Sequence, residues 1–143
     1  MTLYHFTAGQ HIEKIRAEGL TKGAFPRSIN PRTGAVVMVG GYQWLTRERS
    51  FDQPWAALGS LPITRNAWRI TVAIPLEARR HCAHWPALCA RISGLQVADY
   101  FNAIPGSSDW FVYHGRIPPS WFLAVERNNE GRINPFDLLE GAQ

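Results

Sequence analysis

Six short β-prone runs, most of them ended by glycine, proline or polar residues, most constrain what this chain can fold into. They occupy residues 3–7, 35–39, 42–46, 67–75, 109–114 and 121–127. The clearest run is AWRITVAIP at 67–75, which is rich in β-branched residues, alternates along its length and is closed by proline. The chain is therefore expected to build a sheet from short strands.

Two helical segments and one long loop are expected between these runs. Residues 10–18 carry Ile12 and Ile15 on one face, follow a capping Thr7 and end at Gly19. Residues 76–92 are expected to form a second helix that a proline interrupts, and residues 21–34 a loop, because they hold two glycines and two prolines. With helices early and strands late, the expected fold class is α+β with a largely antiparallel sheet.

Length and hydropathy favour one domain. The 143 residues fit a single compact domain, residues 1–143. No apolar run approaches the roughly 20 residues that a membrane helix needs, so no membrane partner is expected. The first ten residues lack the basic and then apolar pattern of a secretion signal, so a cytoplasmic location is expected. Cys82 and Cys89, two turns apart on the expected helix, are too distant for a disulfide and suit a reducing compartment.

The charge of the chain indicates an anionic partner without identifying it. The formal net charge is +4, with 13 arginines and 2 lysines spread along the sequence rather than grouped in blocks. A dinucleotide or a nucleic acid would suit this charge. The two glycines in MVGGYQW belong to neither a Rossmann fingerprint nor a P-loop. The segment HCAHWPALC lacks four ligands at a standard spacing, so no metal site is expected.

The opening strand, LYHFT, has a histidine in its middle, at a position where an apolar residue would be usual. Side chains alternate along a strand, so Leu3, His5 and Thr7 share one face and Tyr4 and Phe6 share the other. The Tyr4 and Phe6 face is expected to be the core. An imidazole is rarely buried without a partner, so His5, on the opposite face, is expected to meet a ligand.

In this order the segments resemble the ADP-ribosyltransferase superfamily, above all its small single-domain bacterial and phage members. LYHFTAGQHIEKIRAEGL resembles the family's opening strand, helix and Gly-Leu; YQWLT resembles its second core strand; WRITVAIP resembles a following strand with an embedded arginine. SSDWFVYHGRIPPSWFLAVE resembles the closing pair of strands. The likeness runs from Leu3 to about Glu126 and leaves out the tail, residues 128–143. It implies a split, mostly antiparallel β-sheet with a few helices around a cleft for NAD, the co-substrate.

The same resemblance implies which residues contact NAD. His5 would hydrogen-bond a ribose, because a neutral imidazole offers one donor and one acceptor. Thr7, on the same strand face, would assist it. Tyr42 or Trp44 would pack on the nicotinamide ring, and Thr46 would support that wall.

Charged residues complete the expected site. Arg27 or Arg32, in the long loop, is expected to hold the pyrophosphate, because guanidinium groups match phosphate oxygens. Loss of nicotinamide builds positive charge on the ribose, which a carboxylate near the 2′-hydroxyl stabilises. Asp109 occupies the family's acidic position, where glutamate is more common, and is expected to be catalytic together with His5. Glu126 has the more common residue type but stands at the exit of the last expected strand.

Three functions follow from the resemblance and stay open on the sequence. The first is NAD-dependent mono-ADP-ribosylation of a nucleic acid or a protein, as in toxins and proteins of phage–host conflict; some relatives only hydrolyse NAD. The second is transfer of an RNA 2′-phosphate to NAD, which related folds perform with several basic residues in the cleft. The third is a degenerate member that binds a nucleotide, a nucleic acid or a protein without turnover.

Overall fold

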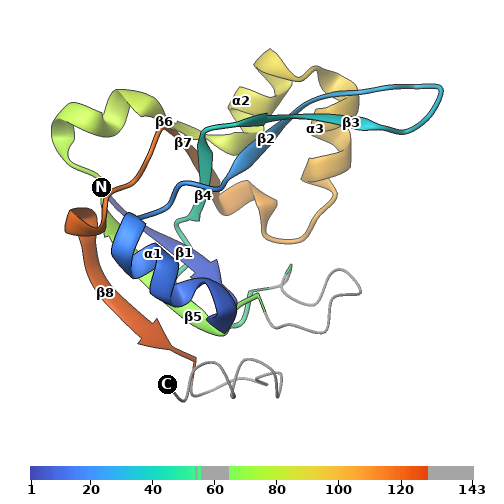
Figure 1. Ribbon diagram of the computed structural model, residues 1–143. Helices are drawn as coiled ribbons and strands as arrows, with labels where there is room; N and C mark the ends of the chain where they lie inside the picture. The colour runs from blue at the N-terminus through green and yellow to red at the C-terminus, as the bar shows by residue number, and fades with distance from the viewer. Residues whose placement is uncertain (54, 56–64, 129–143) are drawn as a thin grey trace.

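The computed structural model describes residues 1–53, 55 and 65–128. Residues 129–143 of the tail lie outside the described residues, as do residues 54 and 56–64. The strands are β1 Thr2–Thr7, β2 Ala24–Ile29, β3 Val36–Gly40, β4 Tyr42–Thr46, β5 Trp68–Ala73, β6 Cys82–His84, β7 Trp110–His114 and β8 Phe122–Arg127 (Figure 1). The α-helices are α1 Ile12–Glu18, α2 Trp85–Ile92 and α3 Leu95–Asn102, and the 3-10 turns are η1 Gly9–His11, η3 Leu76–His81, η4 Ser107–Asp109 and η5 Pro119–Trp121.

The main sheet has the order β6-β7-β4-β1-β5-β8, and every pairing in it is antiparallel. The expectation of an α+β fold with a largely antiparallel sheet is confirmed. β1 pairs with β5 along its whole length, from Thr2 opposite Ala73 to Thr7 opposite Trp68. On its other side β1 pairs with β4 at a single position, Tyr4 opposite Thr46.

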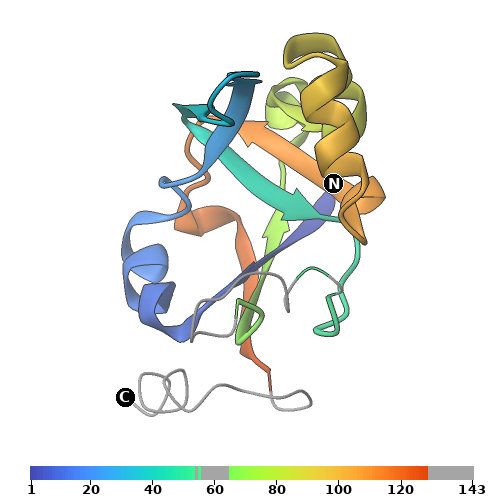
Figure 2. The same cartoon turned by 90° about the vertical axis from the view of Figure 1, so that its right-hand side faces the viewer.

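The short β1–β4 ladder divides the sheet into two halves that diverge from one seam (Figure 2). One half consists of β6, β7 and β4, and the other of β1, β5 and β8. Two apolar cores lie against the sheet, and the first of them includes Leu45 of β4 and Tyr113 of β7 as well as residues of β1 and β5. The core beside β1 and β5 holds Leu3, Ile12, Leu20, Leu45, Ile70, Val72, Ile74, Ala78, Tyr113 and Ile117. The core beneath α2 and α3 holds Phe25, Trp85, Leu88, Cys89, Val97, Ala98 and Val112.

The structure corrects the expected faces of the opening strand. Leu3 is buried in the core with Ile12 of α1, so the face that carries Leu3 is also a core face. Phe6 points the other way and packs edge-on against Phe51 and Trp55, with ring centroids 5.8 and 6.3 Å away. The alternation was correct, and Phe6 is buried as expected, but the core is not confined to the Tyr4 and Phe6 face, because Leu3 is buried on the other face.

Two expected segments are also wrong. Residues 21–34, expected to be a loop, contain β2, which tolerates Pro26 because a bulge follows at that point of its pairing with β3. Residues 76–92, expected to be one helix, form η3, then β6, then α2, because Cys82–His84 pair with β7.

Cys82 and Cys89, both free thiols, therefore lie on different elements. The helices are not concentrated early, since α2 and α3 precede β7.

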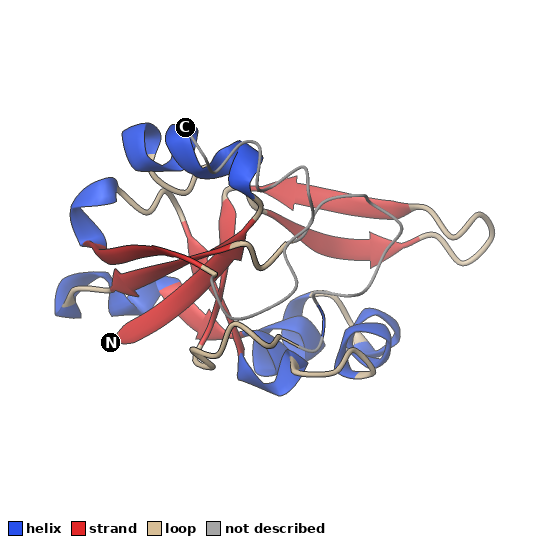
Figure 3. Ribbon diagram, turned by 90° about the horizontal axis from the view of Figure 1, so that it is seen from below, coloured by secondary structure: helices blue, strands red, loops and turns tan. Residues whose placement is uncertain are grey.

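The β2–β3 hairpin forms a separate two-stranded sheet that projects from the body (Figure 3). The Gln43 amide links its base to the body: Gly23 N–H donates to Gln43 Oε1 at 3.0 Å, and Gln43 Nε2 donates to Gly115 O at 3.1 Å. Among the described residues, none of the helices is both long and apolar enough to cross a membrane.

Candidate functional site

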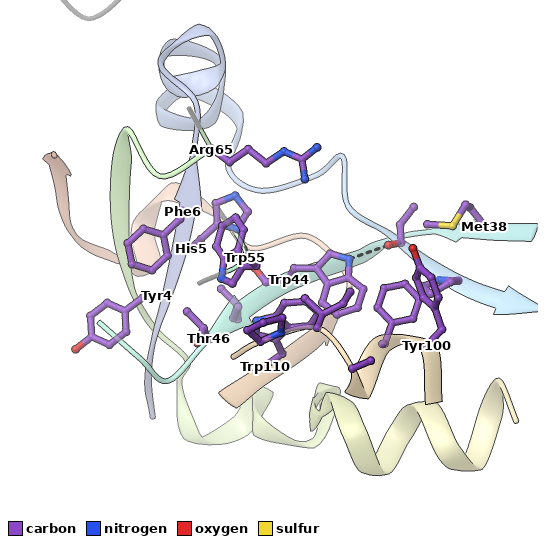
Figure 4. A pocket seen from close by; sticks show the side chains of 17 residues that line it. Tyr4, His5, Phe6, Met38, Trp44, Thr46, Trp55, Arg65, Tyr100 and Trp110 are labelled. Atoms are coloured by element: carbon purple, nitrogen blue, oxygen red, sulfur yellow. Dashed lines mark hydrogen bonds between the residues drawn. The ribbon is translucent and has the colours of Figure 1, made fainter. Parts of the chain in front are cut away.

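A cavity of about 870 Å³ opens at the seam between the two half-sheets (Figure 4). Side chains from both faces of β1 reach it, because the β1–β4 ladder ends after one pair. Apart from Arg65 the walls come from β1, β4, the hairpin base, Trp55, α3 with its following turn, and the start of β7. The lining residues are Tyr4, His5, Phe6, Ala24, Pro26, Met38, Trp44, Leu45, Thr46, Trp55, Arg65, Tyr100, Phe101, Ala103, Ile104, Pro105 and Trp110.

Aromatic rings form much of this wall, and Trp44 stands at their centre. Its ring packs edge-on against Trp85 and Trp110, with centroids 4.7 and 5.7 Å away, and roughly parallel to Phe101 at 6.4 Å. Its Nε1–H donates to Ala24 O at 2.8 Å, which ties β4 to the hairpin base. These contacts fix the orientation of the indole, so its exposed surface is a rigid platform for a planar ring.

The side chain of His5 on β1 reaches across the seam to β4. Its Nδ1 lies 2.8 Å from Trp44 O. A carbonyl oxygen only accepts, so Nδ1 carries the proton in this contact and donates it. Burial lowers the pKa of His5, and the hydrogen bond to Trp44 opposes this only in part. The ring is therefore neutral at pH 7, and its Nε2 is left as an acceptor in a mostly apolar cavity.

The other residues expected to contact NAD are only partly brought together. Thr46 lies in the cavity wall, and its Oγ1 accepts a hydrogen bond from Glu48 N–H at 3.1 Å. Thr7 is buried and is not a lining residue, and its hydroxyl is 3.5 Å from Ala8 O. Tyr42 stacks on His114 at 4.5 Å between ring centroids, outside the cavity wall. Of Tyr42 and Trp44, the structure places Trp44 in the cavity.

Among the lining residues that the structure describes, the cation is Arg65, which no sequence motif indicates. Arg27 and Arg32, the expected pyrophosphate ligands, are exposed on the hairpin and lie outside the wall. Nothing in the sequence around Arg65 signals this position, because it is 60 positions from His5 and belongs to no motif. The exposed rings of α3, such as Tyr100, were missed because residues 94–108 had no clear pattern.

Asp109 stands next to the cavity rather than in its wall. It ends η4, immediately before the lining residue Trp110. Its Oδ1 accepts from Arg47 Nε at 2.6 Å, and both side chains are partly exposed. Glu126, on β8, is paired in a similar way with Arg69 at 3.0 Å. Among the lining residues that the structure describes, none is a carboxylate.

Thiol and metal chemistry find no support in the described part of the chain. Burial raises the pKa of Cys82 to about 11, so this thiol is protonated at neutral pH and a poor nucleophile. Within residues 1–53, 55 and 65–128, no three histidine, cysteine, aspartate or glutamate side chains gather as a metal site would need.

Comparison with family models, with curated proteins and with solved structures gave no match to this chain.

Proposed function

We propose that this cavity binds NAD and that the protein transfers ADP-ribose from NAD to a macromolecular acceptor. The observation that carries the proposal is His5. The resemblance expects this histidine to face a cleft between two parts of a split sheet. It lines a cavity at the seam between two half-sheets, with Nδ1 held by Trp44 O and Nε2 free to accept from a ribose hydroxyl.

The remaining wall suits the rest of the dinucleotide. Trp44 and Trp110 offer apolar ring surfaces for nicotinamide or adenine, and Arg65 offers a guanidinium group for the pyrophosphate. A volume of about 870 Å³ is in the usual range of pockets for ligands of intermediate size. The predominance of aromatic walls with few polar groups is also typical of such pockets.

The chemistry breaks the bond between the ribose C1′ and the nicotinamide nitrogen. Nicotinamide leaves with the bonding electron pair, and the ribose develops oxocarbenium character. An acceptor oxygen or nitrogen then bonds to C1′ and gives up its proton to a base. A carboxylate beside the 2′-hydroxyl stabilises the cation through a hydrogen bond that strengthens in the transition state.

Asp109 is the proposed carboxylate, and its bond to Arg47 must open for this role. Ion pairs between partly exposed side chains contribute only about 0.2–1 kcal/mol. A bound pyrophosphate offers Arg47 a stronger anionic partner than a single carboxylate does. Binding of NAD beside Trp110 would then draw Arg47 away and leave Asp109 free to turn toward the ribose.

A second candidate function is nucleotide binding without turnover. It is favoured by the absence of a carboxylate among the described lining residues and by the Asp109–Arg47 pair. The two candidates agree on the ligand and differ in whether nicotinamide is released.

One experiment separates them. The wild-type protein is incubated with NAD labelled in the nicotinamide ring, and free nicotinamide is measured beside equilibrium binding of NAD by calorimetry. Binding with release supports the transferase or NAD hydrolysis. Binding without release, also in the presence of candidate acceptors, supports the second candidate. Absence of binding at millimolar NAD would reject both.

A further inference from the structure

The outer edge of β3 is a bare strand edge. The hairpin sheet contains β2 and β3 alone, so within the described chain no strand pairs with β3 on its second side. The body occupies the opposite edge of the hairpin. Trp44 Nε1–H donates to Ala24 O at 2.8 Å, and Ser93 Oγ donates to Pro26 O at 2.8 Å.

These two contacts also fix which backbone groups of β3 face outward. Ala24 and Pro26 turn their carbonyl groups to the body, away from β3. Their partners in the ladder are Gly40 and Met38. In an antiparallel pair, the residues opposite such positions turn their own N–H and C=O groups to the other edge. Met38 therefore presents its backbone polar groups along the outer edge of the hairpin.

The side chains along β3 are exposed as well. Val36, Val37 and Met38 retain 47%, 53% and 52% of their accessible surface. Consecutive residues of a strand point to opposite faces, so both faces of β3 are uncovered here. Natural proteins protect such edges with charges, prolines or bulges. This hairpin carries its proline, its bulge and Arg27 on β2, the inner strand, and none of them on β3.

The charged side chains of the hairpin segment have one sign. Residues 22–40 contain one lysine and two arginines and no aspartate or glutamate. Arg27 and Arg32 on the hairpin are exposed. The tip that carries Arg32 is ordered, since Asn30 Oδ1 accepts from Arg32 N–H at 2.9 Å and Gly34 N–H donates to Asn30 O at 2.8 Å. Pairing with a second copy of the hairpin would bring like charges together, whereas an acidic partner would complement them.

We propose that the outer edge of β3 binds an extended, acidic segment of a partner protein, which adds a strand to the hairpin. Main-chain hydrogen bonds to the edge would give affinity, and contacts of carboxylates with Arg27 and Arg32 would select acidic sequences. A single-stranded nucleic acid fits less well, because it needs exposed aromatic rings for stacking and the hairpin exposes aliphatic ones. Met38 also lines the cavity, so the docked segment would reach the site. Binding of the segment does not depend on the proposed function, whereas its role as the acceptor of ADP-ribose rests on that function.

The test measures binding without NAD, so its outcome does not depend on turnover. The probe is a fluorescein-labelled peptide of alternating valine and glutamate, long enough to pair with all of β3. Lysine-for-glutamate and proline-containing peptides and an oligothymidylate of similar length are compared with it by fluorescence polarisation. The acidic peptide is expected to bind, and the other three are expected to bind at least about tenfold more weakly.

Variants locate the bound peptide. Arg27→Glu with Arg32→Glu should weaken binding about tenfold, as expected for two exposed charge contacts. Met38→Pro should also weaken it, because proline removes the outward N–H group without touching the bonds to β2. The matched control is Arg79→Glu on η3, an exposed arginine far along the chain, which should leave binding unchanged. Circular dichroism confirms folding of each variant.

Two results would overturn the proposal. One is an acidic peptide that binds no better than its lysine counterpart or the oligonucleotide. The other is equal binding by the hairpin variants and Arg79→Glu in proteins with wild-type circular dichroism.

Discussion

His5 joins the two half-sheets through a single hydrogen bond, and its protonation state decides what it can offer a ligand. Burial holds the pKa of His5 below the ordinary 6.5. Between the lowered pKa and 6.5 the unfolded chain binds more protons than the folded one. The unfolding free energy therefore falls as the pH drops through this window, and the contribution of neutral His5 is fully present above pH 6.5.

We expect His5→Gln to remove part of this acid sensitivity. The difference in unfolding free energy between wild type and variant should change by at most about 1.4 kcal/mol per pH unit below pH 6.5. Urea unfolding at pH 7.5, 6.5 and 5.5 measures it. A difference that is the same at all three pH values would mean that His5 has no lowered pKa.

Asp109 and Glu126 form a matched pair, because each is a partly exposed carboxylate bound to one arginine. If Asp109 stabilises the oxocarbenium ion, Asp109→Asn should lower turnover on the order of 10²–10³-fold. NAD affinity should stay within a few-fold, since the contact matters mainly in the transition state. Glu126→Gln should retain wild-type turnover. Nicotinamide release is the measurement, and the reverse pattern would assign the catalytic role to Glu126.

Arg65 and Arg32 are rival ligands for the pyrophosphate. Arg65 lines the cavity, whereas Arg32 lies at the exposed tip of the hairpin. Hydrogen bonds to charged groups contribute about 1.5–3 kcal/mol, so Arg65→Gln should weaken NAD binding by one to two orders of magnitude. Calorimetric titration of NAD and ADP-ribose decides between them. Loss of affinity in Arg32→Gln, with Arg65→Gln unchanged, would place the phosphates on the hairpin.

At the scale of elements, the hairpin base depends on one close approach of backbone. A Cβ atom on Gly23 would lie 1.9 Å from Tyr42 O, a distance that requires the strands to move apart. Gly23→Ala should therefore lower the unfolding free energy by about 1–3 kcal/mol. Gly40 pairs with the residue that follows Gly23 and has open space around it. Gly40→Ala should change stability by at most about 0.5 kcal/mol. Thermal unfolding of both compares them, and equal effects would contradict the geometry.

Elements with a strong local pattern were predictable from sequence, and elements held by tertiary contacts were not. Residues 42–46 follow the breaker Gly40-Gly41 and are rich in β-prone residues, and β4 has those bounds. β2 was missed because its proline signals a loop, while the pairing that compensates comes from β3, where Met38, the partner of Pro26, lies twelve positions later. β6 was missed because a helical composition is overridden by its pairing with β7.

The same distinction applies to the residues of the candidate site. His5, Trp44 and Thr46 lie in or beside strands with a recognisable pattern, and all three line the cavity. Arg65 and Tyr100 reach it from segments without such a pattern, and only the fold brings them near β1. Arg27 and Arg32 were expected in the site because the loop that carries them was not recognised as a hairpin that projects from the body.

At the scale of the whole molecule, the seam makes stability dependent on what fills it. The two half-sheets share one backbone pair between β1 and β4, the hydrogen bond from His5 to Trp44 O, and an apolar core in which Leu45 of β4 and Tyr113 of β7 pack with residues of β1 and β5. A ligand that contacts both His5 and Trp44 would bridge the halves and bind the folded chain alone. Such a ligand stabilises the folded state by about 2.7 kcal/mol when its concentration is 100 times its dissociation constant.

We therefore expect NAD at that concentration to raise the melting temperature on the order of 5–10 °C for a chain of this size. ADP-ribose lacks the ring that would pack on Trp44, so at equal concentration it should raise the melting temperature less. Trp44→Leu should reduce the difference between the two ligands, because it removes the platform while it keeps an apolar side chain at the seam. Differential scanning fluorimetry with NAD, ADP-ribose and nicotinamide measures these shifts. Equal shifts for NAD and ADP-ribose in the wild type would mean that nicotinamide does not lie on Trp44. No shift with NAD would remove this dinucleotide as the ligand of the cavity.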